Sequence, residues 1–422
     1  MSVRRPFIAG PTPAQFWLQE CSSAFRLLIA TSWLAPDSWR AHQEDAIRQA
    51  VAGGPDWQEY LALVDRHRTP ALSWAALTRT PGINFPAAVQ GELQRRDRAC
   101  RLAALHRTTA LAEVIRNFNR AEIPVIPLKG PLLSLELYGD TGIRQSWDLD
   151  VLVTEEDYPR ATKRLEDMGW RTIESDRFLS FLTPQQSAAV WQHAHHVGYV
   201  HPRNGFLELH WSILSHQPEQ TAGCWARSVH STWSGATFRR MDSIDQTLYL
   251  CEHGSEHAWF RAKWLGDLAR LYAIEYVDWN AADARTRAAI QERPLLLALR
   301  LLNEVYGLPL PFYDSEPITN LPPLLIRHTT RRLQRFKETA MVPSFSFLWK
   351  KLCEIRFDRA LRPHKTWRQS LREATYRADD FALVRLPDKF FWAYAPLRPF
   401  LWIVRVLRRF SPHLGDSKQP SA

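Results

Sequence analysis

The sequence lacks closely spaced cysteines. Its 422 residues include five cysteines, and no two of them stand in a C-x-x-C spacing. They are Cys21, Cys100, Cys224, Cys251 and Cys353. An odd number of scattered cysteines argues against a disulfide framework and against a zinc ribbon, and it favours a reducing compartment.

Long apolar runs are also missing. No run approaches the roughly 18 apolar residues needed to cross a bilayer, and the residues after Met1 form no signal peptide. Apolar residues make up 45% of the chain and charged residues 23%, as in ordinary globular proteins. The length of 422 residues allows two or three domains, and no internal repeat of 20–50 residues occurs. We expect a cytoplasmic protein without a transmembrane segment.

Positive charge is concentrated in the last quarter of the chain. Residues 325–422 contain 21 Lys and Arg but 8 Asp and Glu, a net charge of +13, whereas the whole chain carries +10. Such a segment is suited to RNA, to an anionic membrane surface or to an acidic partner. Residues 401–410 have the composition of a membrane-surface helix. A solvated, Arg-rich helical face is the alternative interpretation.

Helical and β-type patterns alternate in the middle of the chain. Residues 1–95 have a helical pattern, and apolar residues at i, i+3, i+4 and i+7 predict a later helix that ends near Arg120. Residues 124–128 then resemble a short buried strand. Pro131 and Gly139 suit the first position and the end of a helix over 131–138.

Further strands are expected over residues 149–153 and 170–173, separated by a helix that starts at a capping-box-like Thr154–Asp157 segment. Asn204-Gly205 between β-type runs at 195–202 and 206–213 predicts a hairpin. We therefore expect an α+β core over residues 96–240. A helical region over 1–95 precedes it, and helical regions over 241–320 and 321–422 follow.

The acidic pair Asp148 and Asp150 carries the clearest chemical signal. On a strand, side chains at i and i+2 share one face, so both carboxylates project together while Leu149 and Val151 enter the core. Carboxylates beside a core are costly unless a positive charge lies between them. We interpret the pair as ligands of two Mg²⁺ (or Mn²⁺) ions, with a solvated strand edge as the alternative.

Glu208 and His210 share a face of the hairpin strand by the same rule. If this strand lies beside the Asp strand, Glu208 becomes a third carboxylate that completes the metal site and accepts a proton from an acceptor hydroxyl. His210 is expected to orient a carboxylate from behind. A solvated strand face is the alternative.

Phosphate binding is predicted upstream of the acidic pair. Gly130 allows the backbone to approach phosphate oxygens, and the following helix N-terminus favours anions. Lys129 can pair with a phosphate, and Arg144 can either hold a phosphate or neutralise the nearby acids. No Walker A motif is present, and a plain turn is the alternative.

Two groups of histidines need separate interpretations. His253 and His257 share a helix face in a helical pattern over 247–271 that also carries Asp267. We favour a helix that turns these groups toward a nucleotide or acceptor; core histidines and the H-x-x-E-H motif of a zinc protease are the alternatives. The other group is not expected to bind metal, because strand alternation separates its members. It comprises His193, His195, His196 and His201.

Taken in order, these segments resemble the uncharacterised bacterial nucleotidyltransferase family of the DNA polymerase beta-like superfamily over about residues 100–275. The segments that carry the resemblance are 128–130, 138–140, Arg144, 148–153, 207–211, 251–253, His257 and 263–267. Three features depart from the wider superfamily. Lys129-Gly130 replaces a Gly-Ser turn, the gap from Gly130 to Asp148 is longer, and Glu208 stands where Asp is common.

The resemblance implies a minimal nucleotidyltransferase fold, an NTP donor and Mg²⁺. It assigns catalysis and metal binding to Asp148, Asp150 and Glu208. The candidates for binding the nucleotide are Lys129, Gly130, Arg144, His210, His253, His257 and Asp267. A nucleoside monophosphate would be moved to a hydroxyl or phosphate of a small molecule, peptide or protein, in a setting such as natural-product or exopolysaccharide biosynthesis. Two alternatives stay open: a non-catalytic nucleotide- or partner-binding protein, and a toxin that modifies tRNA or protein.

Overall fold

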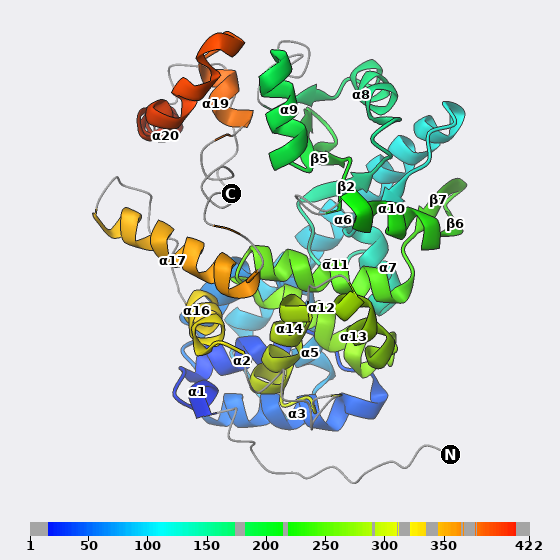
Figure 1. Cartoon of the computed structure of the whole chain (residues 1–422). Helices are drawn as coiled ribbons and strands as arrows, with labels where there is room; N and C mark the ends of the chain where they lie inside the picture. The colour runs from blue at the N-terminus through cyan, green and yellow to red at the C-terminus, as the bar shows by residue number, and fades with distance from the viewer. Residues whose placement is uncertain are drawn as a thin grey trace. The chain divides into compact units, whose positions relative to one another are not determined.

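A computed structural model describes most of the chain (Figure 1). The described residues are 16–173, 182–213, 218–288, 292–309, 311, 321–334, 345–363, 366, 376 and 378–410. They belong to two compact units. Unit 1 consists of residues 1–108, 129–146 and 242–336, and unit 2 consists of residues 109–128, 147–241 and 337–422. Both units are discontinuous in sequence. The consecutive regions expected with boundaries at 95, 240 and 320 stay a prediction.

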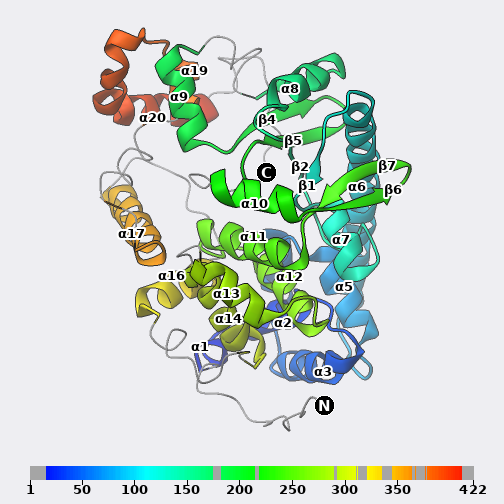
Figure 2. The same cartoon turned by 45° about the vertical axis from the view of Figure 1, so that its right-hand side comes forward.

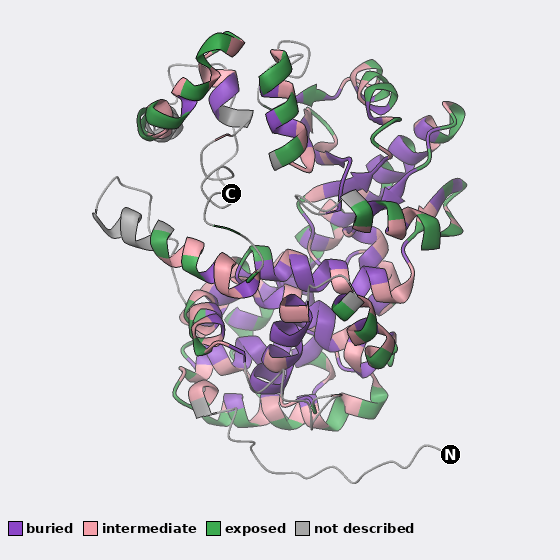
Figure 3. Cartoon of the chain, in the orientation of Figure 1, coloured by how far each residue is buried: buried purple, intermediate pink, exposed green. Residues whose placement is uncertain are grey.

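Unit 1 contains only helices and their connections among its described residues (Figure 2). Its helices are α1 (Phe16–Gln19), α2 (Ser23–Thr31), α3 (Asp37–Ala52), α4 (Trp57–His67), α5 (Pro70–Arg79), the first part of α6 (Ala87–Arg120), α7 (Pro131–Tyr138), α11 (Ser243–Glu256), α12 (Ala262–Ala273), α13 (Trp279–Ala288), α14 (Glu292–Tyr306) and α16 (Pro323–Gln334). The leucine-rich α14 is buried along most of its length and packs against α2, α11 and α12 (Figure 3). Unit 1 is therefore built around α14.

The helical pattern over residues 247–271 forms two helices rather than a continuous one. The chain leaves α11 through Ala258 and Trp259, whose φ angles of 46° and 51° lie in the left-handed region. The Trp259 N–H donates to the Gly254 carbonyl oxygen at 2.8 Å, and the buried indole lies against Gly254. A β-carbon at Gly254 would come within 2.4 Å of that ring. The break therefore lets the Trp259 indole fold back onto a glycine, which periodicity alone does not reveal.

Gly266 allows α12 to pack directly on backbone. A β-carbon at this position would lie 2.3 Å from the Ser32 carbonyl oxygen, and neither backbone can yield without disturbing the core. We expect Gly266→Ala to lower the free energy of unfolding by about 3 kcal/mol, as overpacked cores do. Gly91→Ala is the matched control, because Gly91 lies in α6 with nothing near its missing β-carbon.

Denaturant unfolding of both variants measures this difference. The control should be more stable than the wild type by about 0.5–1 kcal/mol, since glycine is a poor residue in a helix interior. Equal stabilities for Gly266→Ala and the wild type would mean that the α12 contact is not tight.

Unit 2 carries a small mixed sheet, which with the surrounding helices confirms the expected α+β class. Its strand order is β1 (Ile126–Pro127), β2 (Asp148–Leu152), β5 (Gly205–His210), β4 (His196–His201) and β3 (Arg171–Thr172). Strands β2 and β5 are parallel, and the other neighbouring pairs are antiparallel. A separate hairpin consists of β6 (Val229–Trp233) and β7 (Ala236–Arg240).

The two faces of the sheet differ as period-2 alternation requires. Leu149, Val151, Leu207, Leu209 and Tyr199 are buried on one face, and the other face carries Asp148, Asp150, Glu208, His196 and His210. The predicted strands and the Asn204-Gly205 hairpin are confirmed within one to three residues at each end. The helix expected after Thr154 begins later, at Tyr158, after a turn in which the Thr154 hydroxyl accepts the Asp157 N–H.

Further helices complete unit 2. Those described are the second part of α6, α8 (Tyr158–Asp167), α9 (Pro184–His193), α10 (Pro218–Arg227), α17 (Phe345–Leu361), α19 (Ala378–Leu383), the 3₁₀ helix η3 (Asp388–Ala393) and α20 (Tyr394–Phe410). The Tyr394 hydroxyl ties η3 and α20 to α9, since it donates to the Val384 carbonyl oxygen and accepts from Gln186. None of the described helices has the length and apolar content that a membrane crossing requires.

Candidate active site

Two neighbouring parallel strands bring the predicted carboxylates together in unit 2. In the β2–β5 register Asp150 lies beside Glu208, and Asp148 lies beside Phe206. Because alternate side chains share a face, Asp148, Asp150, Glu208 and His210 all project from the same side of the sheet. Oxygen and nitrogen atoms of Asp150, Glu208 and His210 lie within 4.8 Å of one another. The predicted juxtaposition of the Asp strand and the Glu208 strand is therefore present.

Burial and the neighbouring charges shift the pKa of His210 in opposite directions. Asp150 and His210 are buried, whereas Glu208 is half-buried. The His210 Nε2 atom lies 3.5 Å from Asp150 Oδ1 and 3.5 Å from Glu208 Oε2. Burial lowers the pKa of His210, but the two neighbouring carboxylates outweigh it and leave that pKa raised. The cluster therefore stabilises positive charge at a buried position.

The donor set fits a divalent cation. A buried carboxylate such as Asp150 is stable when a positive charge or hydrogen-bond donors face it, and Glu208 adds a second carboxylate in reach. Hard cations such as Mg²⁺ bind carboxylate oxygens and retain several waters, which suits the partly exposed Asp148 and Glu208. The residues at this face thus match the chemistry of a Mg²⁺ or Mn²⁺ site.

His195 and His196 also reach this cluster, contrary to the expectation that alternation keeps these histidines apart. His196 pairs with His210 across the β4–β5 ladder, so both face the carboxylate side. His195 precedes β4, so strand alternation does not fix the side on which its side chain projects. The hairpin register contained the signal, because pairing His201 with Gly205 places His196 opposite His210.

His201, another member of the predicted histidine group, stabilises the hairpin turn instead. The His201 Nδ1 atom accepts the backbone N–H groups of Arg203 and Asn204, which fixes the hairpin turn. Its ring lies against Trp170. The side chain of His193 lies outside the described residues, although its backbone ends α9.

Arg144 and Asp267 form a buried ion pair within unit 1. The Arg144 Nε atom donates to both Asp267 carboxylate oxygens, each at 2.9 Å, and Nη1 lies 3.3 Å from the Ser146 hydroxyl. Lys263 also belongs to this group and donates to the Gln145 carbonyl oxygen. Burial raises the pKa of Asp267, while the charges of Arg144 and Lys263 oppose that shift. The pair joins the loop before β2 to α12.

The loop that carries Arg144 is held by hydrogen bonds rather than by regular structure. The Ser134 hydroxyl donates to the Asp140 carbonyl oxygen and accepts the Arg144 N–H. The Asp140 carboxylate accepts the Gly142 N–H and pairs with Arg101. These contacts give Asp140 of the Tyr138-Gly-Asp140 segment a structural role.

Lys129 and Gly130 lie at the N-terminus of α7 as expected. Gly130 adopts φ 78° and ψ −142°, a conformation that is essentially restricted to glycine, and Pro131 takes the first helical position. No side chain caps this helix. The role of Lys129 and Gly130 in phosphate binding stays a prediction.

His253 and His257 lie against Trp264 of α12 in unit 1. His257 stacks on Trp264 with ring centroids 5.1 Å apart, and the His253 ring lies edge-on to Trp264 at 5.2 Å. Burial lowers the pKa of His253, and the charge of Lys129 lowers it further. Among the described residues, each group of three potential metal ligands lies in unit 2 and none includes the H-x-x-E-H segment. The nucleotide-binding roles of His253, His257 and Asp267 stay predictions.

Comparison with known families decides the identity of the chain at family level. A family model described as uncharacterised nucleotidyltransferase matches residues 53–307, more than half of the chain. The chain belongs to this nucleotidyltransferase family. No curated protein and no solved structure matches it. The match to the nucleotidyltransferase model covers every candidate site residue from Lys129 to Asp267, and it ends before the basic C-terminal region.

Proposed function

We propose that this member of the family is a metal-dependent enzyme that moves a nucleoside monophosphate from an NTP to a hydroxyl or phosphate of an acceptor. The observation that carries the proposal is the side-by-side placement of Asp150 and Glu208 on parallel strands, with Asp148 on the same face. Three carboxylates at one face are suited to two Mg²⁺ (or Mn²⁺) ions that hold a triphosphate.

In this proposal the three carboxylates have two roles, cation binding and proton acceptance. Asp148 and Asp150 hold the cations, which when bound neutralise charge that develops on the phosphate oxygens. Glu208, which is half-buried and therefore reached by solvent, binds the cation and receives the proton of the acceptor hydroxyl. The acceptor oxygen forms a bond to the α-phosphorus, the bond from that phosphorus to the β-bridging oxygen breaks, and pyrophosphate leaves. His210 orients Asp150 and Glu208.

The acceptor is proposed only by class: a small molecule, a peptide or a protein, with tRNA as an alternative. The testing experiment incubates the purified chain with each α-labelled NTP, Mg²⁺ or Mn²⁺, and lysate of the host. A labelled acceptor supports the transferase. Nucleotide-dependent thermal stabilisation without any labelled product would instead support a non-catalytic nucleotide-binding protein.

The partner proposed for the C-terminal region is an anionic membrane surface. The aromatic side chains of Trp392 and Phe400 on η3 and α20 are 64% and 65% exposed. Lys389 on η3 is also exposed, with its Nζ atom 5.1 Å from the centroid of the Phe390 ring. Exposed aromatics within a region of net charge +13 suit a headgroup layer, where the rings insert and the cations meet phosphate.

Vesicle sedimentation tests this partner. Replacing Trp392 and Phe400 by serine should weaken binding to phosphatidylserine-containing vesicles by about tenfold or more, given the apolar area withdrawn from water. The matched control replaces Leu102 and Leu105 on α6, which are 64% and 61% exposed, by serine. Equal binding of both double variants, or binding to RNA but not to vesicles, would overturn the membrane assignment.

A further inference from the structure

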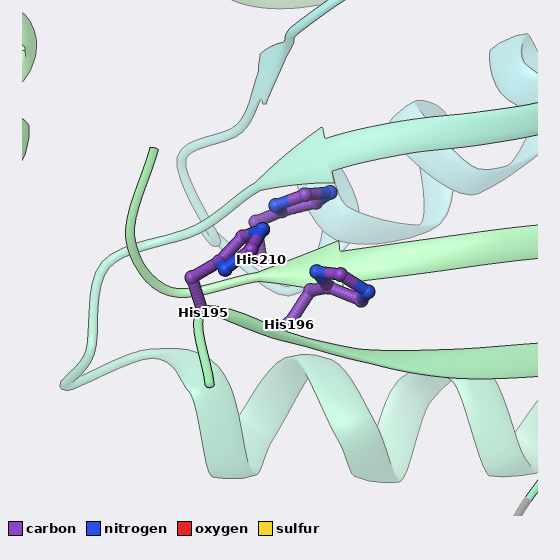
Figure 4. Close-up of side chains that lie close together, drawn as sticks. All are labelled: His195, His196 and His210. Carbon is purple, nitrogen blue, oxygen red and sulfur yellow. The ribbon is translucent and has the colours of Figure 1, made fainter. Parts of the chain in front are cut away.

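Three imidazole rings converge at the end of the β4–β5 hairpin in unit 2. The ring centroids of His195 and His196 are 4.5 Å apart, those of His196 and His210 are 4.7 Å apart, and those of His195 and His210 are 5.5 Å apart. Figure 4 shows the three rings gathered at the strand ends. One ring nitrogen from each residue lies within 4.8 Å of the others. The group is thus compact enough for all three residues to contact a single atom.

The backbone of this group is fixed by the sheet. His196 and His210 are directly paired across the ladder. The His195 carbonyl oxygen accepts the Trp211 N–H at 3.0 Å, and the His210 carbonyl oxygen accepts the Val153 N–H at 3.0 Å. Only side-chain rotations are therefore needed to adjust the distances between the rings, and the cost of organising the group is small.

His210 supplies an independent indication that a ligand belongs here. Its ring is buried, and its Nδ1 atom has no hydrogen-bond partner among the described residues, whereas Nε2 lies 3.5 Å from both Asp150 Oδ1 and Glu208 Oε2. Buried polar atoms are normally hydrogen-bonded, and such exceptions mark sites for ions or catalytic groups. Glu208 stands close by, with Oε1 at 3.8 Å from His196 Nε2 and Oε2 at 3.5 Å from His210 Nε2. A carboxylate beside ligating imidazoles is the usual surrounding of a metal–histidine site.

We propose that His195, His196 and His210 bind one Zn²⁺-class dication. Imidazole nitrogen suits Zn²⁺ and the neighbouring transition metals, whereas Mg²⁺ prefers oxygen ligands. A tetrahedral site with Zn–N bonds of about 2.0–2.1 Å requires nitrogens about 3.4 Å apart, a modest closure of the present arrangement. Three histidines leave the fourth position for water, or for the Glu208 carboxylate.

This site goes beyond the proposed nucleotidyl transfer, because it has a different donor set and a different metal preference. It touches the carboxylate cluster through His210 and Glu208 but does not include Asp148. The two sites are therefore separable by mutation at His195 and His196 on one side and at Asp148 on the other.

Equilibrium dialysis with Zn²⁺ alone, followed by elemental analysis, tests the site on the full-length chain. The wild type should bind Zn²⁺ in the presence of millimolar Mg²⁺. His195→Ala and His196→Ala should each weaken Zn²⁺ binding by about 100-fold. His230→Ala, on the exposed face of β6, is the matched control and should bind like the wild type.

Further measurements keep the outcomes distinct. Thermal unfolding with and without Zn²⁺ identifies any variant that fails to fold, and His196→Asn serves as a smaller change. Asp148→Asn should keep Zn²⁺ binding while losing pyrophosphate release, whereas loss of its Zn²⁺ would mean that the carboxylates hold the metal. Unchanged Zn²⁺ binding in folded His195→Ala and His196→Ala overturns the histidine site and leaves nucleotidyl transfer untouched. Zn²⁺ binding without pyrophosphate release from any NTP contradicts the proposed function alone.

Discussion

Asp150→Asn is expected to lower Mg²⁺-dependent turnover by about 1,000-fold. The substitution preserves the size of a buried side chain but removes the charge that, in the proposed function, would hold a cation next to Glu208. A bound cation contributes several kcal/mol of transition-state stabilisation, and each 1.4 kcal/mol corresponds to tenfold in rate. Asp148→Asn should have an effect of the same order, because both carboxylates project from one face of β2. The measurement is the initial rate of pyrophosphate release.

Glu155→Gln is the matched control for these variants. Glu155 lies in the same segment, three residues after the end of β2, and it is exposed. Its neutralisation should leave the rate within about twofold of the wild type, since surface charges at this distance are screened. Circular dichroism and thermal unfolding establish that each variant is folded. Folded Asp148→Asn and Asp150→Asn proteins with undiminished turnover would remove these residues from the chemistry.

Arg144→Met is expected to lower the free energy of unfolding by about 3–5 kcal/mol. The Arg144 and Asp267 side chains are 2% and 1% exposed, and the substitution leaves the Asp267 carboxylate buried without its main counter-charge. Removing one partner of a buried ion pair typically costs this much, because the remaining charge cannot regain its hydration. Asp267→Asn should have a similar effect. Denaturant unfolding measures both.

The double variant Arg144→Met/Asp267→Leu shows how much of the lost stability comes from leaving one charge buried without a partner, rather than from losing the attraction between the two. It should lose less stability than the two single variants together, because neither charge is then left buried alone. Arg40→Met provides the exposed control: its partner Asp37 is solvated, and such pairs contribute about 0–1 kcal/mol. Stability of Arg144→Met close to the wild type would mean that Asp267 does not depend on this pair.

The acidic centre is predictable because its rules are local. Alternation along β2 places Asp148 and Asp150 on one face, and Asn204-Gly205 defines the hairpin that carries Glu208. The pairing of β2 with β5 is less local, since α8, β3, α9 and β4 lie between the two strands in sequence. The sequence left that step as a condition, and the β2–β5 register shows it.

Other features depend on contacts that no local pattern encodes. Arg144 and Asp267 are 123 positions apart, so their pairing follows from the packing of the loop before β2 on α12. The break between α11 and α12 depends on Trp259 folding back onto Gly254. His196 faces His210 through the β4–β5 register, whereas His195 can join them because β4 begins only at His196; a strand that began one residue earlier would have placed His195 on the opposite face from His196.

The most direct test follows the α- and γ-phosphates of the NTP separately. The purified chain is incubated with Mg²⁺, acceptor-containing lysate and either α-labelled or γ-labelled NTP, with Asp150→Asn in parallel. Nucleotidyl transfer predicts α-label on the acceptor, γ-label in pyrophosphate, equal amounts of the two products, and neither product with Asp150→Asn. Transfer of the γ-label to the acceptor, or no release of either label from any of the NTPs with Mg²⁺ or Mn²⁺, would contradict a nucleotidyltransferase centred on Asp148, Asp150 and Glu208.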